Sequence, residues 1–271
     1  MGEWLLEVPL TWMAALVFAV IYFIAAVVYF GVIGLAVDAR RASGFKAFSP
    51  ALLAPLGIIF GLLVGFVAVQ VWNDFDRAKS AVTSEAGALR VVVLLAESLP
   101  EEQKAELRTL VDRHIEEAVQ QEWGAMAAQR LTIASLPSHL VEALHIVLAL
   151  RPADEAQRTV QRELVNDLHS ALDARHQRIV ISQSSVSPVK WAAILVQGLC
   201  TLIAIAMVHS DNRLACAIAL ALFGTGIAAL VLLICAYSQP FTGEISIGPD
   251  ILKRVMTGQP WIRTGIPEIP R

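Results

Sequence analysis

The stretch Pro55-Leu56-Gly57-Ile58-Ile59-Phe60-Gly61-Leu62-Leu63-Val64-Gly65-Phe66 decides the fold class, because it contains no charged or strongly polar side chain. It lies inside a longer apolar run, residues 51–72, whose only strongly polar residue is Gln70. About 20 apolar residues are enough to cross the hydrocarbon core of a bilayer as an α-helix. We therefore predict that this run is a transmembrane helix.

The composition of the whole chain also indicates an integral membrane protein. Its 271 residues are 56% hydrophobic and 17% charged, whereas soluble domains carry about 25% charged residues. This balance argues against a cytosolic enzyme, a secreted module or a disordered regulator, and the net charge of −3 gives no reason to expect nucleic acid as a partner. Three further apolar runs are long enough to span a bilayer: Leu10–Val37, Trp191–Val208 and Leu214–Ala236.

The polar region between the second and third spans is predicted to be helical, because its apolar residues recur at helical spacing. Two such sets are Leu107, Leu110, Val111, Ile115 and Ala118, and Val160, Leu164, Leu168, Leu172 and Ile179. The segment Ser98-Leu99-Pro100-Glu101-Glu102 predicts a helix start with Ser98 as its cap. We expect an all-α membrane protein with four transmembrane helices and a helical extramembrane domain between the second and third. Its parts are an N-terminal transmembrane pair (1–72), the extramembrane helical domain (73–190), a C-terminal transmembrane hairpin (191–236) and a C-terminal segment (237–271).

The predicted spans carry no Asp, Glu, Lys, Arg or His. Pumps, ion-coupled transporters and intramembrane proteases usually need such groups at depth, so this absence argues against all three. The sequence also contains no phosphate-binding loop, no nucleophile motif and no set of metal ligands. We therefore predict that the protein is not an enzyme and needs no cofactor or metal.

Two parallel rows run along the second predicted span. Gly57, Gly61 and Gly65 recur at every fourth residue, a spacing that lets another helix approach closely. Pairing of two spans within one chain would explain this row, and so would contact between copies. Ala54, Ile58 and Leu62 form the second row, which would line a hydrophobic constriction if several copies shared a central axis. Spacing alone does not distinguish such a constriction from side chains that face lipid.

The run from Ala54 to Asp76 resembles the pore helix of the bestrophin channels, in which a proline and a glycine precede a Trp-Trp-Asn-Gln-Tyr-Glu segment. Aligned without gaps, the family proline falls on Pro55 and its glycine on Gly61. The Trp-Asn-Gln-Tyr-Glu part falls on Trp72-Asn73-Asp74-Phe75-Asp76. The resemblance implies that the pore neck lies at Ala54, Ile58 and Leu62, the row already defined by helix geometry.

A second match follows the fourth span. Here the family's Asn-Pro-Phe-Gly-Glu corresponds to Gln239-Pro240-Phe241-Thr242-Gly243-Glu244, with one inserted residue, so that the matching positions are Pro240, Phe241, Gly243 and Glu244. Glu85-Ala86 and Glu122-Trp123 resemble short motifs of a bestrophin-like group of bacterial membrane proteins. The calcium-binding aspartate run of the family is replaced by Ile245-Ser246-Ile247-Gly248-Pro249, so calcium activation is not carried over.

The resemblance implies an ion channel of the bacterial inner membrane, in which five copies surround one axis and ions pass passively through a hydrophobic neck. Its partners would be the lipid bilayer, copies of itself and inorganic ions, with no nucleic acid. The family arrangement places the helical domain in the cytoplasm. The bases after the first span (Arg40, Arg41 and Lys46) favour the opposite side, whereas five others flank the membrane on the domain side: Arg77, Lys79, Arg175, Arg178 and Lys190. The alternative function is a non-conducting membrane sensor or scaffold whose helical domain reports to a partner.

Overall fold

The computed structural model describes residues 9–36, 52–131, 137–184 and 186–256, and within these ranges it contains helices and no strand. The predicted all-α class is therefore confirmed. The chain forms two compact units, which are described separately. The first comprises residues 1–76 and 184–246, and the second comprises residues 77–183 and 247–271.

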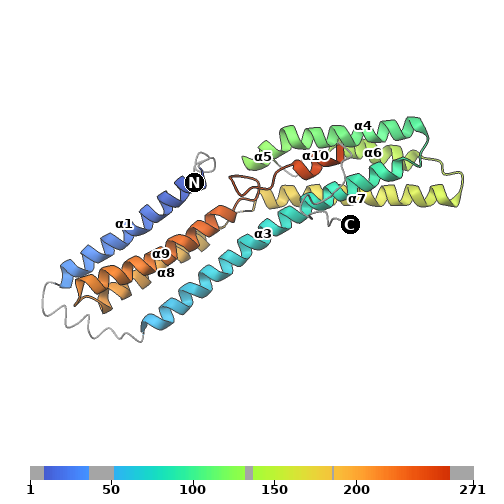
Figure 1. Cartoon of the computed structure of the whole chain (residues 1–271). Helices are drawn as coiled ribbons and strands as arrows, with labels where there is room; N and C mark the ends of the chain where they lie inside the picture. The colour runs from blue at the N-terminus through green and yellow to red at the C-terminus, as the bar shows by residue number, and fades with distance from the viewer. Residues whose placement is uncertain (1–8, 37–51, 132–136, 185, 257–271) are drawn as a thin grey trace, which may run out of the picture. The chain divides into compact units, whose positions relative to one another are not determined.

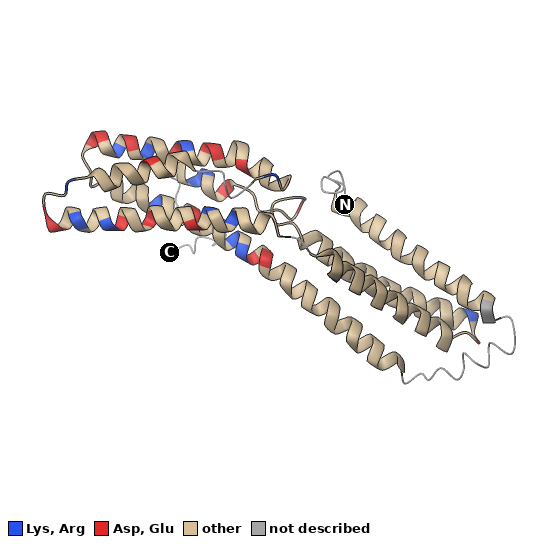
Figure 2. Ribbon diagram, turned by 180° about the vertical axis from the view of Figure 1, so that it is seen from behind, with Lys and Arg blue, Asp and Glu red and all other residues tan. Residues whose placement is uncertain are grey.

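The first unit holds the apolar helices. They are α1 (Leu10–Ala36), the first part of α3 (Leu53–Ala96), α8 (Pro188–Val208) and α9 (Arg213–Tyr237). Each is long and apolar enough to cross a membrane, as the sequence predicted. Charged side chains are almost absent from these helices and are concentrated in the second unit (Figure 2). Helix α3 does not end with its apolar run, so residues 53–72 are its spanning segment and residues 73–96 are its polar continuation.

Helices α1, α8 and α9 pack against one another and lie side by side in Figure 1. The contact between α1 and α9 is close at Gly224, where an added methyl group would lie 3.7 Å from Ile21. At the same contact the hydroxyl groups of Tyr22 and Thr225 are 2.7 Å apart. Asn212 caps the start of α9, because its side-chain oxygen accepts two backbone N–H groups at 3.1 Å. Helices α8 and α9 also pack against each other and are joined by the short connection at residues 209–212.

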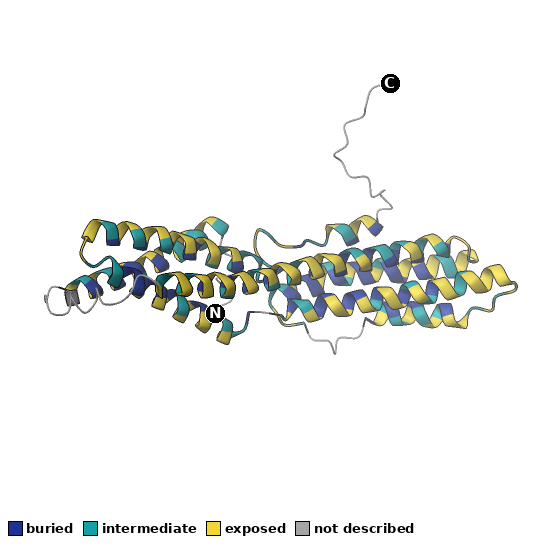
Figure 3. Cartoon of the chain, turned by 90° about the horizontal axis from the view of Figure 1, so that it is seen from below, coloured by how far each residue is buried: buried dark blue, intermediate teal, exposed yellow. Residues whose placement is uncertain are grey.

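The second unit is a bundle of polar helices around an apolar core. Its elements are the last part of α3, α4 (Glu101–Glu117), the π-helical turn η3 (Ala118–Glu122), α5 (Trp123–Ala127), α6 (Ser138–Ala149), α7 (Glu155–Ser182) and α10 (Asp250–Met256). Buried residues face one another across the bundle and exposed residues cover its outside (Figure 3). The first predicted set, from Leu107 to Ala118, is buried throughout. Leu164, Leu168 and Ile179 of the second set are also buried.

The helix ends show where local prediction succeeded. Helix α4 begins at Glu101, as expected, with two carboxylates in its first turn. The predicted cap is wrong, because Pro100 occupies the N-cap position and no side chain caps the helix. Ser98 instead lies in the turn that closes α3, where its backbone N–H donates to the carbonyl of Leu95 at 3.0 Å. Helix α7 has a true side-chain cap, Asp154, which accepts the N–H of Gln157 at 2.7 Å.

Candidate functional site

The spanning part of α3 has one packed face and one open face. Phe60, Val64, Val67 and Val71 are buried in the core of the first unit, and their spacing follows one side of the helix. The predicted neck residues lie on the open side. Ala54 is exposed, and Ile58 and Leu62 retain 63% and 56% of their accessible surface. The open face of α3 therefore carries the aliphatic row.

The glycine row also lacks a packing partner in the part of the chain that the structure describes. A methyl group added at Gly57, Gly61 or Gly65 would meet no described atom within 4 Å. By contrast, a methyl group at Gly198 of α8 would lie 3.4 Å from Phe60. Pairing of two spans within one chain therefore does not account for the glycine row among the described residues.

Side-chain contacts join α3 to the other helices of its unit. The rings of Phe60 and Phe223 have centroids 5.5 Å apart. Gln197 of α8 donates from Nε2 to the carbonyl of Leu56 at 3.2 Å. Toward the other end of the span, the Lys190 ammonium donates to the side-chain oxygen of Gln70. These contacts hold α3 on one side, and no described residue packs closely on its glycine row.

The residues of the first sequence motif lie where the spanning part of α3 ends. The rings of Trp72 and Phe75 both contact Tyr237 of α9, with centroid distances of 5.2 and 5.3 Å. Asn73 and Asp76 are exposed. The motif thus includes a small aromatic cluster that joins α3 to the end of the fourth span.

The second motif forms the connection after α9. Pro240 and Phe241 are buried, whereas Glu244 is exposed. Gly243 has a φ of +88°, which side-chain-bearing residues rarely adopt, so a glycine is required at this turn. Among the described residues, no group of three or more His, Cys, Asp or Glu side chains is arranged to hold a metal ion.

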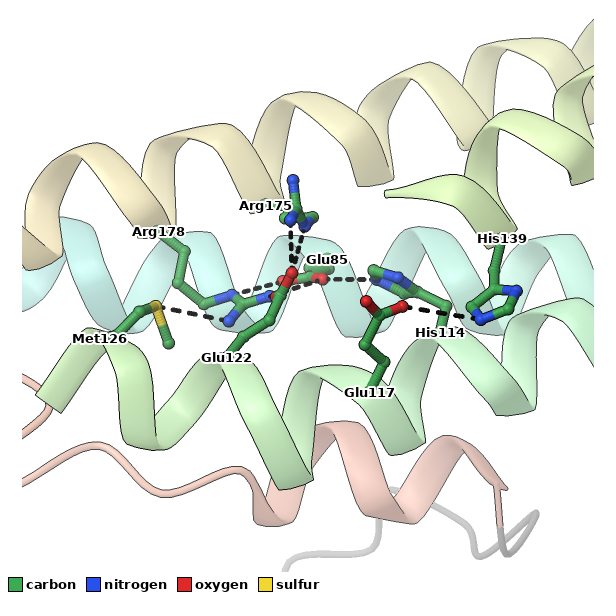
Figure 4. Close-up of polar contacts among 8 residues, drawn as sticks. All are labelled: Glu85, His114, Glu117, Glu122, Met126, His139, Arg175 and Arg178. Atoms are coloured by element: carbon green, nitrogen blue, oxygen red, sulfur yellow. Dashed lines mark hydrogen bonds and ion pairs between the residues drawn. The ribbon is translucent and has the colours of Figure 1, made fainter. Parts of the chain in front are cut away.

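A cluster of charged residues occupies the core of the second unit (Figure 4). Arg178 of α7 donates from Nε to Glu85 Oε2 at 2.8 Å and from Nη2 to Glu85 Oε1 at 3.1 Å. Its Nη2 also donates to Glu122 Oε2 at 2.9 Å. Arg175 donates from Nε to the other oxygen of Glu122 at 2.8 Å. We refer to Glu85, Glu122, Arg175 and Arg178 as the charge cluster.

Three further side chains complete the environment of the charge cluster. His114 of α4 lies with Nε2 3.0 Å from Glu85 Oε1. Met126 accepts a hydrogen bond from Arg178 Nη1 at 3.5 Å. The Arg178 guanidinium also lies 4.8 Å from the centre of the Trp123 ring, a distance suited to a cation–π interaction. The charge cluster and these three side chains together join α3, α4, η3, α5 and α7.

The surroundings of the charge cluster favour its ionised form. Burial would raise the pKa of Glu85, but the charge of Arg178 and the hydrogen bond with His114 outweigh this effect and lower the pKa to about 2. Burial would also lower the pKa of Arg178, but Glu85 and Glu122 raise it above its ordinary value. Because every charge in the cluster has an oppositely charged partner, the ion pairs can persist without water.

The charge cluster corrects one expectation from the sequence. Arg175 and Arg178 were expected to flank the membrane, yet both are buried, with 5% and 0% of their surfaces exposed. Both arginines lie close to Ile179 on the apolar side of α7. This position could have indicated from the sequence that their side chains point inward. The dipeptides Glu85-Ala86 and Glu122-Trp123, first noted through the resemblance, meet here through Arg178.

Comparison with known protein families identifies one family whose sequence model matches this chain. A sequence model described as the Bestrophin-like domain matches residues 10–252. None of the curated proteins matches this chain.

Solved structures give the same fold. A mutant of a bacterial bestrophin homologue from Klebsiella pneumoniae has a TM-score of 0.68 and 14% identity, with 88% of this chain and 99% of that chain covered. A second mutant of the homologue has a TM-score of 0.67 and 16% identity, with 88% and 98% covered. A crystal structure of the homologue phased by Zn-SAD has a TM-score of 0.67 and 13% identity, with 90% and 98% covered.

Proposed function

This chain belongs to the bestrophin-like family, and on that premise we propose that it forms an oligomeric ion channel. Ions would pass down their gradient through a hydrophobic neck lined by the spanning part of α3. The observation that carries the proposal is the open face of α3, on which Ile58 and Leu62 are exposed although the opposite face is packed. The neck comprises Ala54, Ile58 and Leu62.

The glycine row favours contact between copies of the chain. Glycine weakens a helix by about 1 kcal/mol relative to alanine, so three glycines on one row need a compensating contact. In membranes that contact is usually the close approach of another helix. Ile58 and Gly61 are three residues apart and therefore neighbours on the helix surface. A second copy seated on the glycine row would leave the aliphatic row facing a shared axis, and we propose five copies by resemblance.

The chemistry of the proposed neck is that of a hydrophobic gate. Aliphatic side chains around a narrow axis offer no hydrogen bonds to water, so the constriction blocks ions when it loses its water and conducts when it is wide enough to stay wet. The described part of the α3 span carries no charged residue, so the mechanism needs no proton relay or coupled ion. Flux would be passive.

The four apolar helices and the family indicate an integral membrane protein. We propose the bacterial inner membrane as its location, with the second unit in the cytoplasm. The side can be tested at Ala153, which lies in the exposed connection before α7. A single cysteine placed there, in a background without the native cysteines, should be protected from a membrane-impermeant maleimide in intact cells. Labelling in intact cells would show that the second unit lies outside the cytoplasm, contrary to the proposed orientation.

The channel proposal is tested by reconstitution. Purified protein in liposomes should release a trapped ion down its gradient, and particle images along the membrane normal should show a ring of copies around a central hole. Liposomes with an unrelated four-span protein at the same density control for leak. A monomer, a two-fold dimer, or a ring without flux across a range of voltages would overturn the proposal.

A further inference from the structure

The last described segment of the chain is short, and its structure depends on contacts with the rest of the second unit. We call residues 247–256 the strap; it includes the seven-residue helix α10. A helix of this length is not stable alone in water. The strap buries three apolar side chains in the second unit, those of Ile247, Leu252 and Val255, and α10 packs against α4.

One buried hydrogen bond fixes the start of the strap. The indole N–H of Trp123 donates to the carbonyl of Ile247 at 3.0 Å. Trp123 retains only 8% of its accessible surface, so little water is available to replace this bond. A buried carbonyl that loses its donor is costly, and the strap is therefore sensitive to the position of the indole ring.

The same indole ring also contacts the charge cluster. Arg178 lies 4.8 Å from the ring centre, and the residue next to Trp123 in the chain, Glu122, binds Arg175 and Arg178. Two adjacent residues at the junction of η3 and α5 therefore have different partners. Glu122 holds the cluster, and Trp123 holds both the cluster and the strap.

We infer that Glu122-Trp123 couples the strap to the charge cluster, so that the two loosen together. When the strap leaves, the indole loses its acceptor and its packing, and Arg178 loses a fixed ring beside it. The charge cluster contains two carboxylates and two guanidinium groups, so any displacement of Arg178 leaves a buried carboxylate poorly paired. Any factor that detaches the strap would therefore lower the stability of the whole second unit.

This inference goes beyond the proposed channel and does not depend on it, because strap and cluster lie within the second unit. It is tested by hydrogen exchange of backbone amides in the full-length, detergent-solubilised protein. Trp123→Phe keeps an aromatic ring beside Arg178, but it removes the N–H donor together with part of the buried ring. Loss of one hydrogen bond should speed exchange in residues 247–256 about three- to tenfold.

Two further variants test the coupling from each end. Leu252→Ala removes the most deeply buried of the three apolar side chains of the strap without changing the cluster. It should speed exchange both in the strap and in the α3 and α7 peptides around Glu85 and Arg178. Glu122→Gln changes only the cluster, yet should speed exchange in the strap, because coupling is reciprocal. Lys253→Ala is the matched control on α10, since its long ion pair with Asp250 is exposed.

The outcomes are distinct. Faster strap exchange in Trp123→Phe and Glu122→Gln, with faster cluster exchange in Leu252→Ala and no change in Lys253→Ala, supports the coupling. Unchanged strap exchange in Trp123→Phe overturns the role of the indole. A strap released in Leu252→Ala while the α3 and α7 peptides exchange as in the wild type overturns the coupling. Neither result depends on whether the protein conducts ions.

Discussion

Arg178 and Glu85 meet through two hydrogen bonds of 2.8 and 3.1 Å, although 93 residues separate them in the chain. Neither side chain is exposed to solvent. Arg178 comes from α7 and Glu85 from the polar part of α3, so this pair fixes the two longest helices of the second unit against each other. The pair is costly to break, because Glu85 would keep only His114 and Arg178 would keep only Glu122 as a partner of opposite charge in a buried site.

Arg178→Met should destabilise the second unit strongly. The change leaves Glu85 and Glu122 buried without Arg178, and breaking a buried pair typically costs about 3–5 kcal/mol. Thermal unfolding in detergent, followed by hydrogen exchange in α3 and α7, measures the effect. The control is Arg158→Met, which removes an exposed pair with Glu155 and should change stability by less than about 0.5 kcal/mol. Equal stability of the two variants would contradict the assigned role.

The second unit should lose stability in acid partly through Glu85. Its pKa is lowered to about 2 in the folded protein, from an ordinary value of 4.5. A carboxyl group whose pKa is lowered in the folded protein contributes stability at pH values above its ordinary pKa. This contribution is lost as the pH falls from about 4.5 towards 2. The contribution at neutral pH is of the order of 3 kcal/mol.

The acid effect can be isolated with Glu85→Gln. The difference in stability between wild type and this variant should be constant from pH 7 to 5 and should shrink below about pH 4.5. Stability of the second unit is followed by hydrogen exchange at each pH, corrected for the intrinsic exchange rate. A difference that does not change between pH 5 and 3 would show that Glu85 is not the responsible group.

Ile58→Ala and Leu62→Ala should each raise ion flux severalfold. A smaller side chain widens the proposed neck and makes it easier to keep wet. Flux is measured in liposomes at matched protein density. The control is Leu222→Ala on α9, a leucine that is also exposed but lies outside the proposed neck, and this variant should conduct like the wild type. If both neck variants match this control, Ile58 and Leu62 do not line the constriction.

Gly61→Leu should weaken assembly without unfolding the chain. No described atom lies within 4 Å of a methyl group at this position, so the added side chain finds room in the protomer but blocks the close approach of another copy. Native mass spectrometry should show a shift from the oligomer to smaller species. Gly198→Leu is the contrasting variant, because its side chain would run into Phe60 and Ile227 within the protomer. Unchanged assembly of Gly61→Leu would remove the glycine row from the interface.

Local signals predicted the helices well. The four apolar runs became helices because spanning length and apolar composition are properties of a contiguous segment. The faces of α4 and α7 were predicted from periodicity for the same reason. The prediction of Ser98 as a cap was wrong because α3 ends immediately before α4 begins. Ser98 lies in the turn between the two helices, and its backbone hydrogen bond closes α3.

The candidate sites were predicted to different degrees. The row of Ala54, Ile58 and Leu62 follows from helix spacing alone, and the structure adds that it is open. The inward position of Arg175 and Arg178 was missed because arginines near a span are commonly assigned to the membrane surface. Their real partners, Glu85 and Glu122, lie on other helices and far away in the chain.

The sequence by itself determined the number of spans, the all-α class and the order of residues on each helix face, because hydrophobic length and periodicity act over neighbouring residues. Only the tertiary structure decided which faces are covered and which charges are neutralised. Glu85, Glu122 and Arg178 are stable in the core only as a set, and that set forms when three separate helical elements pack together. Burial makes each charge depend on partners that local sequence does not specify.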